Sequence, residues 1–174
     1  MASAAFSILL LGSAAPASAH AAAAPKSAPR ISAAAARMAL SKNGMACPVG
    51  PGRNVTNSFG DSRGGGRRHQ GIDIMAAYST PVYAIEGGTI VKAYTNRRGG
   101  LSIFLRAGSG VQYFYAHQSA NLVVTGQAVT AGQLIGRVGT SRNASGAAPH
   151  VHFERLVGGR SPVDPYGLVK ATCG

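Results

Sequence analysis

The sequence predicts an all-β domain beyond residue 47, built mainly from antiparallel strands as a sandwich or barrel-like sheet. Short apolar runs alternate there with glycine-bearing breaks, a spacing typical of antiparallel architecture. No stretch of this region keeps a 3.6-residue hydrophobic period, which argues against a parallel α/β fold. The aromatic residues lie almost entirely beyond position 58, so we expect the packed core in the same region.

The chain ahead of this region predicts an export signal and a linker. An apolar run at 6–11 is followed by Ala17-Ser18-Ala19, a small-residue cleavage pattern, so we expect residues 1–19 to be a signal peptide and the protein to be secreted or extracytoplasmic. The positively charged start usual in such signals is missing. Gly12, Ser13 and Pro16 break the apolar stretch, which is already too short to span a bilayer, so no stable membrane insertion is expected. Residues 20–46, rich in alanine, serine and proline, predict a flexible linker.

The apolar runs of the remaining chain predict six main strands. We expect them, in chain order, at 80–85, 89–94, 101–106, 111–117, 134–138 and 150–156. Glu86-Gly87-Gly88 predicts a hairpin turn between the first two strands, and residues 107–110 predict one between the third and fourth.

The charge is strongly positive. Seventeen lysines and arginines against five acidic residues give a formal net charge of +12, which favours an anionic partner. No nucleic-acid-binding motif accompanies the charge, and the arginines are not interleaved with aromatics. We therefore expect no nucleic acid but an anionic cell-wall polymer, with solubility as the alternative. Arginine- and glycine-rich segments at 61–68 and 96–100 are expected to be mobile walls around a cleft.

The two cysteines, Cys47 and Cys173, bracket the region of expected strands. Each stands alone, so a metal-binding pair is not indicated. In an exported protein a disulfide is favoured, and closing so long a loop stabilises by roughly 4 to 5 kcal/mol in the chain-entropy model. Buried free thiols are the alternative.

Four side chains suggest a metal site. His150 and His152 are spaced i,i+2 on an expected strand, so they share one face. Most such pairs bind nothing, but His69 and Asp73, at i,i+4, offer a second half on what we expect to be one face of a strand. Three nitrogen and oxygen ligands with an open fourth position are what a hydrolytic zinc site requires.

A further histidine, His117, ends the expected strand 111–117. Close to a metal site, an imidazole can act as a base or stabilise an oxyanion. A strand-end histidine satisfied by a neighbour is the alternative of equal weight.

In this order, the motifs His69-x-x-x-Asp73, Tyr115-Ala116-His117 and His150-x-His152 resemble those of lysostaphin-type, or LytM-type, zinc endopeptidases of peptidase family M23. The resemblance extends over about residues 47–173. It includes the segments Ser58-Phe59-Gly60, Gly71–Ile74, Thr80-Pro81-Val82, Gly126–Gly136 and Val163-Asp164-Pro165.

The resemblance implies a catalytic domain at 47–174 with the fold of that family. It implies a Zn²⁺ ion held by His69, Asp73 and His152, with His150 and His117 as the catalytic histidines. The implied reaction is hydrolysis of an amide in peptidoglycan stems or cross-bridges, by a protein expected to be a monomer. Glu154 shares the strand face of His150 and His152 but is not a family ligand, so we expect a structural role through a hydrogen bond.

Three departures from the family pattern leave all ligands in place. Gln118 stands where the family usually has leucine, Ser79 where it has glycine, and Ala147-Ala148 widens the loop before His150. We expect them to affect substrate preference. Two functions remain: an active secreted peptidoglycan endopeptidase, which the intact ligand set favours, and a non-catalytic wall-binding module that activates a partner hydrolase.

Overall fold

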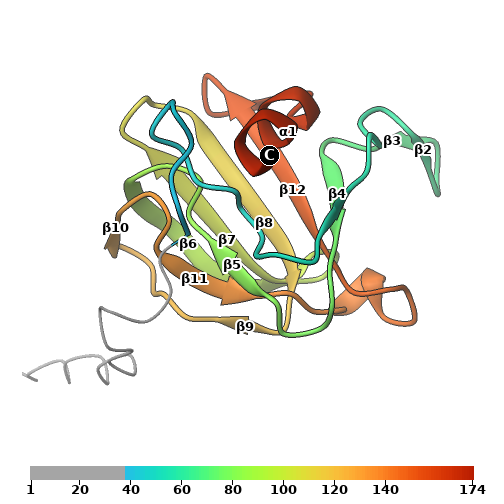
Figure 1. The fold of residues 1–174 in the computed structure, drawn as a ribbon. Helices are drawn as coiled ribbons and strands as arrows, with labels where there is room; N and C mark the ends of the chain where they lie inside the picture. Colours follow the sequence, from blue (N-terminus) through green and yellow to red (C-terminus); the bar gives the residue numbers. More distant parts are fainter. Residues whose placement is uncertain (1–37) are drawn as a thin grey trace, which may run out of the picture.

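The computed structural model describes residues 38–174 (Figure 1). The expected signal peptide and most of the expected linker lie outside the described residues. Every pair of strands in the described chain is antiparallel, which confirms the predicted all-β fold class. The larger sheet runs in the order β1 (Asn54–Val55), β4 (Ile72–Met75), β12 (His150–Val157), β8 (Gln112–Gln118), β7 (Gly100–Ala107), β6 (Gly88–Asn96) and β10 (Ala128–Val129), with β13 (Ser161–Val163) also pairing with β12.

A smaller sheet covers one face of the larger one. It consists of β5 (Pro81–Tyr83), β11 (Leu134–Arg137) and β9 (Ala120–Asn121). The remaining elements are a two-stranded hairpin of β2 (Ser62–Arg63) and β3 (Arg67–Arg68), a 3₁₀ turn η1 (Arg142–Ala144) and the helix α1 (Tyr166–Cys173). Figure 1 shows the β2–β3 hairpin projecting beyond the edge of the sheets next to β4.

The hydrophobic core lies between the two sheets. Alternation along each strand sends every second side chain inward, so Ile103 and Leu105 of β7 and Phe153 of β12 are fully buried. Val82 of β5 and Ile135 of β11, also fully buried, meet them from the smaller sheet. The opposite face of the larger sheet has no second sheet over it among the described residues, and this face carries Asp73, His150 and His152 of the predicted site.

One of the two predicted hairpins is confirmed and the other is wrong. β7 and β8 pair around the turn at 107–110, as expected. β5 and β6 do not pair, although Glu86 and Gly87 lie between them and Gly88 begins β6. Instead, β5 pairs with β11, and β6 pairs with β7 and β10. The glycines therefore carry the chain from the smaller sheet into the larger one. At Gly88 an added Cβ would lie 2.1 Å from the carbonyl oxygen of Arg106, so the crossing needs glycine.

The sequence did not predict helix α1. It has only two turns, which is too short to establish a 3.6-residue period, and it begins after Pro165. Its last residue, Cys173, is bonded to Cys47 with a Cα–Cα distance of 4.7 Å, which confirms the predicted disulfide. The bond joins the two ends of the folded region.

Residues 38–46, at the end of the expected linker, contact the folded domain. The Met38 amide donates to the carbonyl of Gly132, and the Ala46 amide donates to that of Ile85. Ala46 is fully buried. No helix among residues 38–174 is long and apolar enough to cross a bilayer.

Candidate metal centre and cleft

His69 and Asp73 reach the same point from different local structures. Asp73 lies on β4 and points away from the core, because its neighbours Ile72 and Ile74 are fully buried. His69 lies ahead of the strand, in the segment between β3 and β4, so the prediction that both residues lie on one strand face is wrong. The chain bends between them at Gly71, where an added Cβ would lie 2.2 Å from the carbonyl oxygen of Phe153. Only glycine allows this close approach to β12.

The two histidines of β12 share the outward face, as predicted. Val151 and Phe153 between and after them are fully buried, so His150 and His152 point to the opposite side. His152 is paired directly with Asp73 of β4 in the antiparallel register. Directly opposed residues of neighbouring strands lie close enough for their side chains to meet.

His69, Asp73 and His152 bring three donor atoms together. His69 Nε2 lies 3.2 Å from Asp73 Oδ1, His152 Nδ1 lies 3.3 Å from the same oxygen, and the two nitrogens are 2.7 Å apart. Ligands bound at about 2.0–2.1 Å to a tetrahedral zinc ion lie about 3.3–3.4 Å from one another. Two of the three separations match this geometry, and the third requires a small opening between the imidazoles. The donor set therefore fits a zinc ion.

Hydrogen bonds on the far side of each histidine orient the rings. Nδ1–H of His69 donates to the carbonyl of Ser58 at 2.6 Å, and Nε2–H of His152 donates to Glu154 Oε1 at 2.8 Å. Each bond engages one ring nitrogen and leaves the other facing the cluster, where it can bind a metal ion that displaces its proton. The hydrogen bond expected for Glu154 is thus present, and its partner is a candidate ligand.

Arg63 holds the other oxygen of the aspartate, which the sequence did not predict. Its Nη2 lies 2.7 Å from Asp73 Oδ2 and 2.8 Å from His69 Nδ1. His69 Nδ1 carries the proton that it donates to Ser58, so this nitrogen cannot accept a hydrogen bond from Arg63. Arg63 therefore donates to the carboxylate of Asp73. β2 has only two residues, so no hydrophobic pattern in the sequence indicates that its last residue, Arg63, reaches Asp73.

The electrostatics of the cluster favour a cation. Burial raises the pKa of Asp73, but the hydrogen bonds from His152 and His69 outweigh it and hold that pKa well below its ordinary value. Burial lowers the pKa of His152, but the hydrogen bonds to Asp73 and Glu154 raise it by more. A metal ion entering this cluster replaces protons on the imidazoles, so its binding depends on pH.

His117 and His150 lie beside the three donors. The His117 ring centroid is 5.0 Å from that of His150 and 6.1 Å from that of His152. His150 Nε2 is 3.9 Å from Asp73 Oδ1. His117 has a φ of 63°, in the left-handed region that non-glycine residues rarely adopt. This turn of the backbone places both Ala116 and His117 against the same cleft, against the normal alternation of a strand.

In both histidines Nδ1 is held by a backbone carbonyl, which leaves Nε2 for the cleft. Nδ1–H of His117 donates to the carbonyl of Ser141 at 3.0 Å, and Nδ1–H of His150 donates to that of Ala148 at 2.8 Å. Burial, helped by the nearby imidazoles of His150 and His152, lowers the pKa of His117 to about 4. His117 is therefore neutral at pH 7, with Nε2 able to accept a proton.

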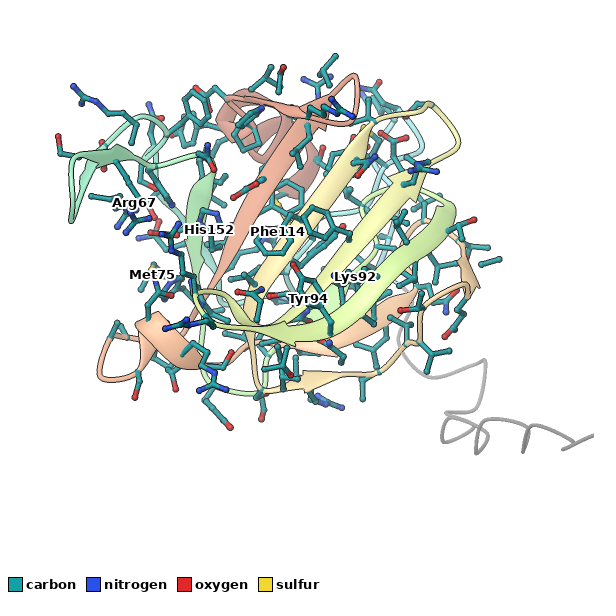
Figure 2. The ribbon with its side chains drawn as sticks, turned by 180° about the vertical axis from the view of Figure 1, so that it is seen from behind. Arg67, Met75, Lys92, Tyr94, Phe114 and His152 are labelled. Carbon is teal, nitrogen blue, oxygen red and sulfur yellow. A yellow bond between two sulfur atoms is a disulfide. The ribbon has the colours of Figure 1, made fainter. Side chains whose placement is uncertain are left out.

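A cleft of about 510 Å³ surrounds these side chains. Its floor includes Phe114 and Tyr94 on the open face of the larger sheet. Figure 2 shows Phe114 next to His152, on the adjacent strand β8, with Tyr94 farther across this face on β6. Both arginine- and glycine-rich segments line it, as predicted, through Arg63, Arg67, Arg68, Arg98 and Gly99. All five predicted site residues, His69, Asp73, His117, His150 and His152, also line this cleft.

Comparisons with known proteins agree with this geometry. The sequence model described as peptidase family M23 matches residues 67–165. The L-Ala–D-Glu endopeptidase of Bacillus subtilis is 34% identical over 144 residues, covering 76% of this chain and 44% of that protein. The glycyl-glycine endopeptidase ALE-1 of Staphylococcus capitis is 42% identical over 93 residues, covering 52% of this chain and 25% of that protein. The chain thus spans less than half the length of either relative.

Solved structures show the same fold. The catalytic domain of lysostaphin from Staphylococcus simulans matches with a TM-score of 0.61 and 34% identity, covering 68% of this chain and 91% of that one. A zinc-containing peptidase from Vibrio cholerae matches with a TM-score of 0.61 and 28% identity, covering 69% of this chain and 38% of that one.

Proposed function

The chain belongs to peptidase family M23, and from this premise we propose that it is a zinc-dependent endopeptidase that hydrolyses peptide bonds in peptidoglycan stems or cross-bridges. The observation that carries the proposal is the convergence of His69 Nε2, Asp73 Oδ1 and His152 Nδ1 at separations of 2.7 to 3.3 Å. The names of the relatives, endopeptidases for L-Ala–D-Glu and glycyl-glycine bonds, support the class of substrate.

His69, Asp73 and His152 would hold the zinc ion. When bound, zinc polarises the carbonyl of the scissile bond and lowers the pKa of a coordinated water toward neutrality. The ligand set contains one carboxylate, so the site carries a net positive charge that favours an anionic tetrahedral intermediate. Arg63 and Glu154 keep Asp73 and His152 in the required orientation and protonation state.

His150 and His117 would transfer protons. Because each Nδ1–H is held by a backbone carbonyl, each Nε2 faces the cleft as a proton acceptor. One imidazole takes a proton from the attacking water, and the imidazolium so formed donates to the oxyanion or to the leaving amine. The low pKa of His117, about 4, makes its protonated form a strong donor toward that amine.

We also propose the setting of this activity. Residues 1–19 would direct export, 20–46 would form the linker, and 47–174 would form the catalytic domain of an extracytoplasmic, monomeric protein. The excess positive charge of the whole chain, +12, would hold the protein on the anionic wall.

The test is mass spectrometry of the fragments that the purified protein releases from peptidoglycan. We expect new peptide termini without glycan cleavage, loss of release with a chelator, and recovery when Zn²⁺ is added back. Binding to the wall with no released peptide, in the presence of zinc, would instead identify the non-catalytic module that activates a partner hydrolase.

A further inference from the structure

Three arginines on the cleft have no acidic partner within the protein. We call Arg67, Arg68 and Arg98 the arginine rim; all three are exposed and line the cleft. None of them forms an ion pair within residues 38–174, where the one ion pair between an arginine and a carboxylate joins Arg63 to Asp73. The residues outside this range contain no aspartate or glutamate. The rim therefore keeps its charge available for a ligand.

The few acidic groups of the chain are already occupied near the site. Of the five acidic residues, only Asp73 and Glu154 line the cleft. Asp73 is bound by Arg63 and the histidines, and Glu154 accepts from His152. The rest of the cleft thus has a positive potential that neither carboxylate neutralises. A low-dielectric cleft lined by one sign of charge attracts ligands of the opposite sign.

The rim lies on both sides of the metal centre. Arg67 and Arg68 form β3 of the hairpin, directly before His69. In Figure 2, Arg67 and Phe114 lie on opposite sides of His152. Arg98 follows β6, on the other side of β12 and β8 in the sheet order. Its turn is held over the end of β8, because the amide of His117 donates to the carbonyl of Gly99 at 2.7 Å. A peptide across the site meets cations at both ends.

Two of the three rim guanidinium groups, those of Arg67 and Arg68, are held by hydrogen bonds but keep spare donors. Arg67 Nε donates to the carbonyl of Gly64 at 3.1 Å, and Arg68 Nη1 donates to that of Gly60 at 3.2 Å. A guanidinium has five N–H groups in a planar fork, so most remain available. That fork matches a carboxylate in a bidentate, charge-assisted pair.

We propose, resting on the function given above, that the cleft selects stem peptides with free carboxylates on both sides of the scissile bond over uncharged glycine bridges. Family membership leaves this choice open, because relatives named for L-Ala–D-Glu and for glycyl-glycine bonds both match. An oligoglycine segment offers the rim only neutral carbonyls, whereas a γ-linked glutamyl residue and a terminal alanine each offer a carboxylate.

The test uses three fluorescently labelled peptides and the zinc-loaded chain. They are the stem peptide L-Ala-γ-D-Glu-L-Lys-D-Ala-D-Ala with free carboxylates, the same peptide with both carboxylates as amides, and pentaglycine amide. Fluorescence anisotropy gives Kd, and chromatography gives cleavage. We expect the free-carboxylate peptide to bind at least tenfold more tightly than its amide, since two charge-assisted pairs are lost.

The arginine rim is tested with Arg67→Gln and Arg98→Gln. Each is expected to weaken binding of the free-carboxylate peptide about three- to tenfold and to leave the amide unchanged. Arg160→Gln, an exposed arginine in the β12–β13 turn that does not line the cleft, is the matched control and is expected to have no effect. Equal binding of acid and amide, tighter binding of pentaglycine, or an equal effect of Arg160→Gln would overturn the proposal. Selective binding of the free-carboxylate peptide without cleavage of any peptidoglycan would contradict the proposed endopeptidase activity but support the carboxylate preference.

Discussion

Along β12, the side chains that face the core and those that face the cleft differ in chemistry. Val151 and Phe153 are apolar and fully buried between the sheets, where they contribute to stability. His150, His152 and Glu154, on the opposite face, are only partly buried and hydrogen-bonded. One strand therefore has a core-facing side, which we call the stability face, and a cleft-facing side, which we call the chemical face. Only the alternation of its side chains separates them. Substitutions on the two faces should affect different measurements.

The largest effect is expected from the three candidate zinc ligands, His152 on the chemical face of β12 and its partners His69 and Asp73. His69→Ala, Asp73→Ala and His152→Ala each remove one of three donors, so we expect loss of stoichiometric zinc and of all peptidoglycan hydrolysis. Metal analysis of the purified variants and release of wall peptides measure the two effects.

His117→Ala and His150→Ala provide the contrast within the same face. They should keep zinc near full occupancy while hydrolysis falls about 10²- to 10⁴-fold, because these imidazoles act on protons in the transition state. Zinc lost from His117→Ala, or activity kept by His152→Ala, would contradict the division between ligands and proton-transfer groups.

The stability face is tested by Phe153→Ala, which we expect to lower the free energy of unfolding by about 3–5 kcal/mol. Its ring packs on Tyr113 and Tyr115 at centroid distances of 5.7 and 5.1 Å, and the cavity left behind cannot fill easily. Urea unfolding measures the change. Phe114→Ala, on the cleft face and partly exposed, is the matched control and should cost clearly less. Equal losses from both variants would mean that the two faces do not differ in packing.

A smaller effect is expected from Glu154→Gln, which removes a charge but hardly any volume. Because Glu154 accepts from Nε2–H of His152, the substitution should weaken zinc affinity about 10- to 100-fold with the fold unchanged. Competition with a chromogenic chelator measures the affinity. Glu86→Gln is the control, since Glu86 accepts from Tyr113 at the other end of β8. Unchanged affinity in Glu154→Gln would reduce this residue to a purely structural role.

The smallest effect concerns pH and the burial of His117. Burial lowers its pKa from 6.5 to about 4, so between these values the unfolded chain binds a proton that the folded chain does not. The free energy of unfolding of the metal-free protein should therefore decrease as pH falls from 6.5 to 4. Below pH 4, His117 is protonated in both states and causes no further decrease. In His117→Ala this decrease should be smaller. Parallel stability curves for the two proteins would show that His117 titrates normally.

Much of the chemical face could be predicted from local spacing. An i,i+2 pair on an extended strand shares a face whatever the strand pairs with, which is why His150 and His152 were correctly placed together. The β7–β8 hairpin was predictable for a similar reason, because its turn and both strands are adjacent in the chain. The approach of Cys47 to Cys173 followed from their position at the two ends of the folded region.

What only the tertiary structure decided depends on contacts between distant segments. β5 and β6 are neighbours in sequence but belong to different sheets, because their partners come from elsewhere in the chain. His117 would face the core by alternation from Tyr113 and Tyr115, yet a positive φ turns it into the cleft, where the Ser141 carbonyl holds its ring.

The same holds for the arginines of the cleft. Arg63 reaches Asp73 because a hairpin folds back beside β4, and Arg98 faces the site from a turn on the far side of β8. The sequence by itself determined the face shared by His150 and His152, the candidate donor residues and the excess of positive charge. Which sheet each strand joins, and which arginines gather around the candidate metal centre, is set by pairing between distant segments. Backbone hydrogen bonds form between any two strands, so the local sequence does not specify the partner.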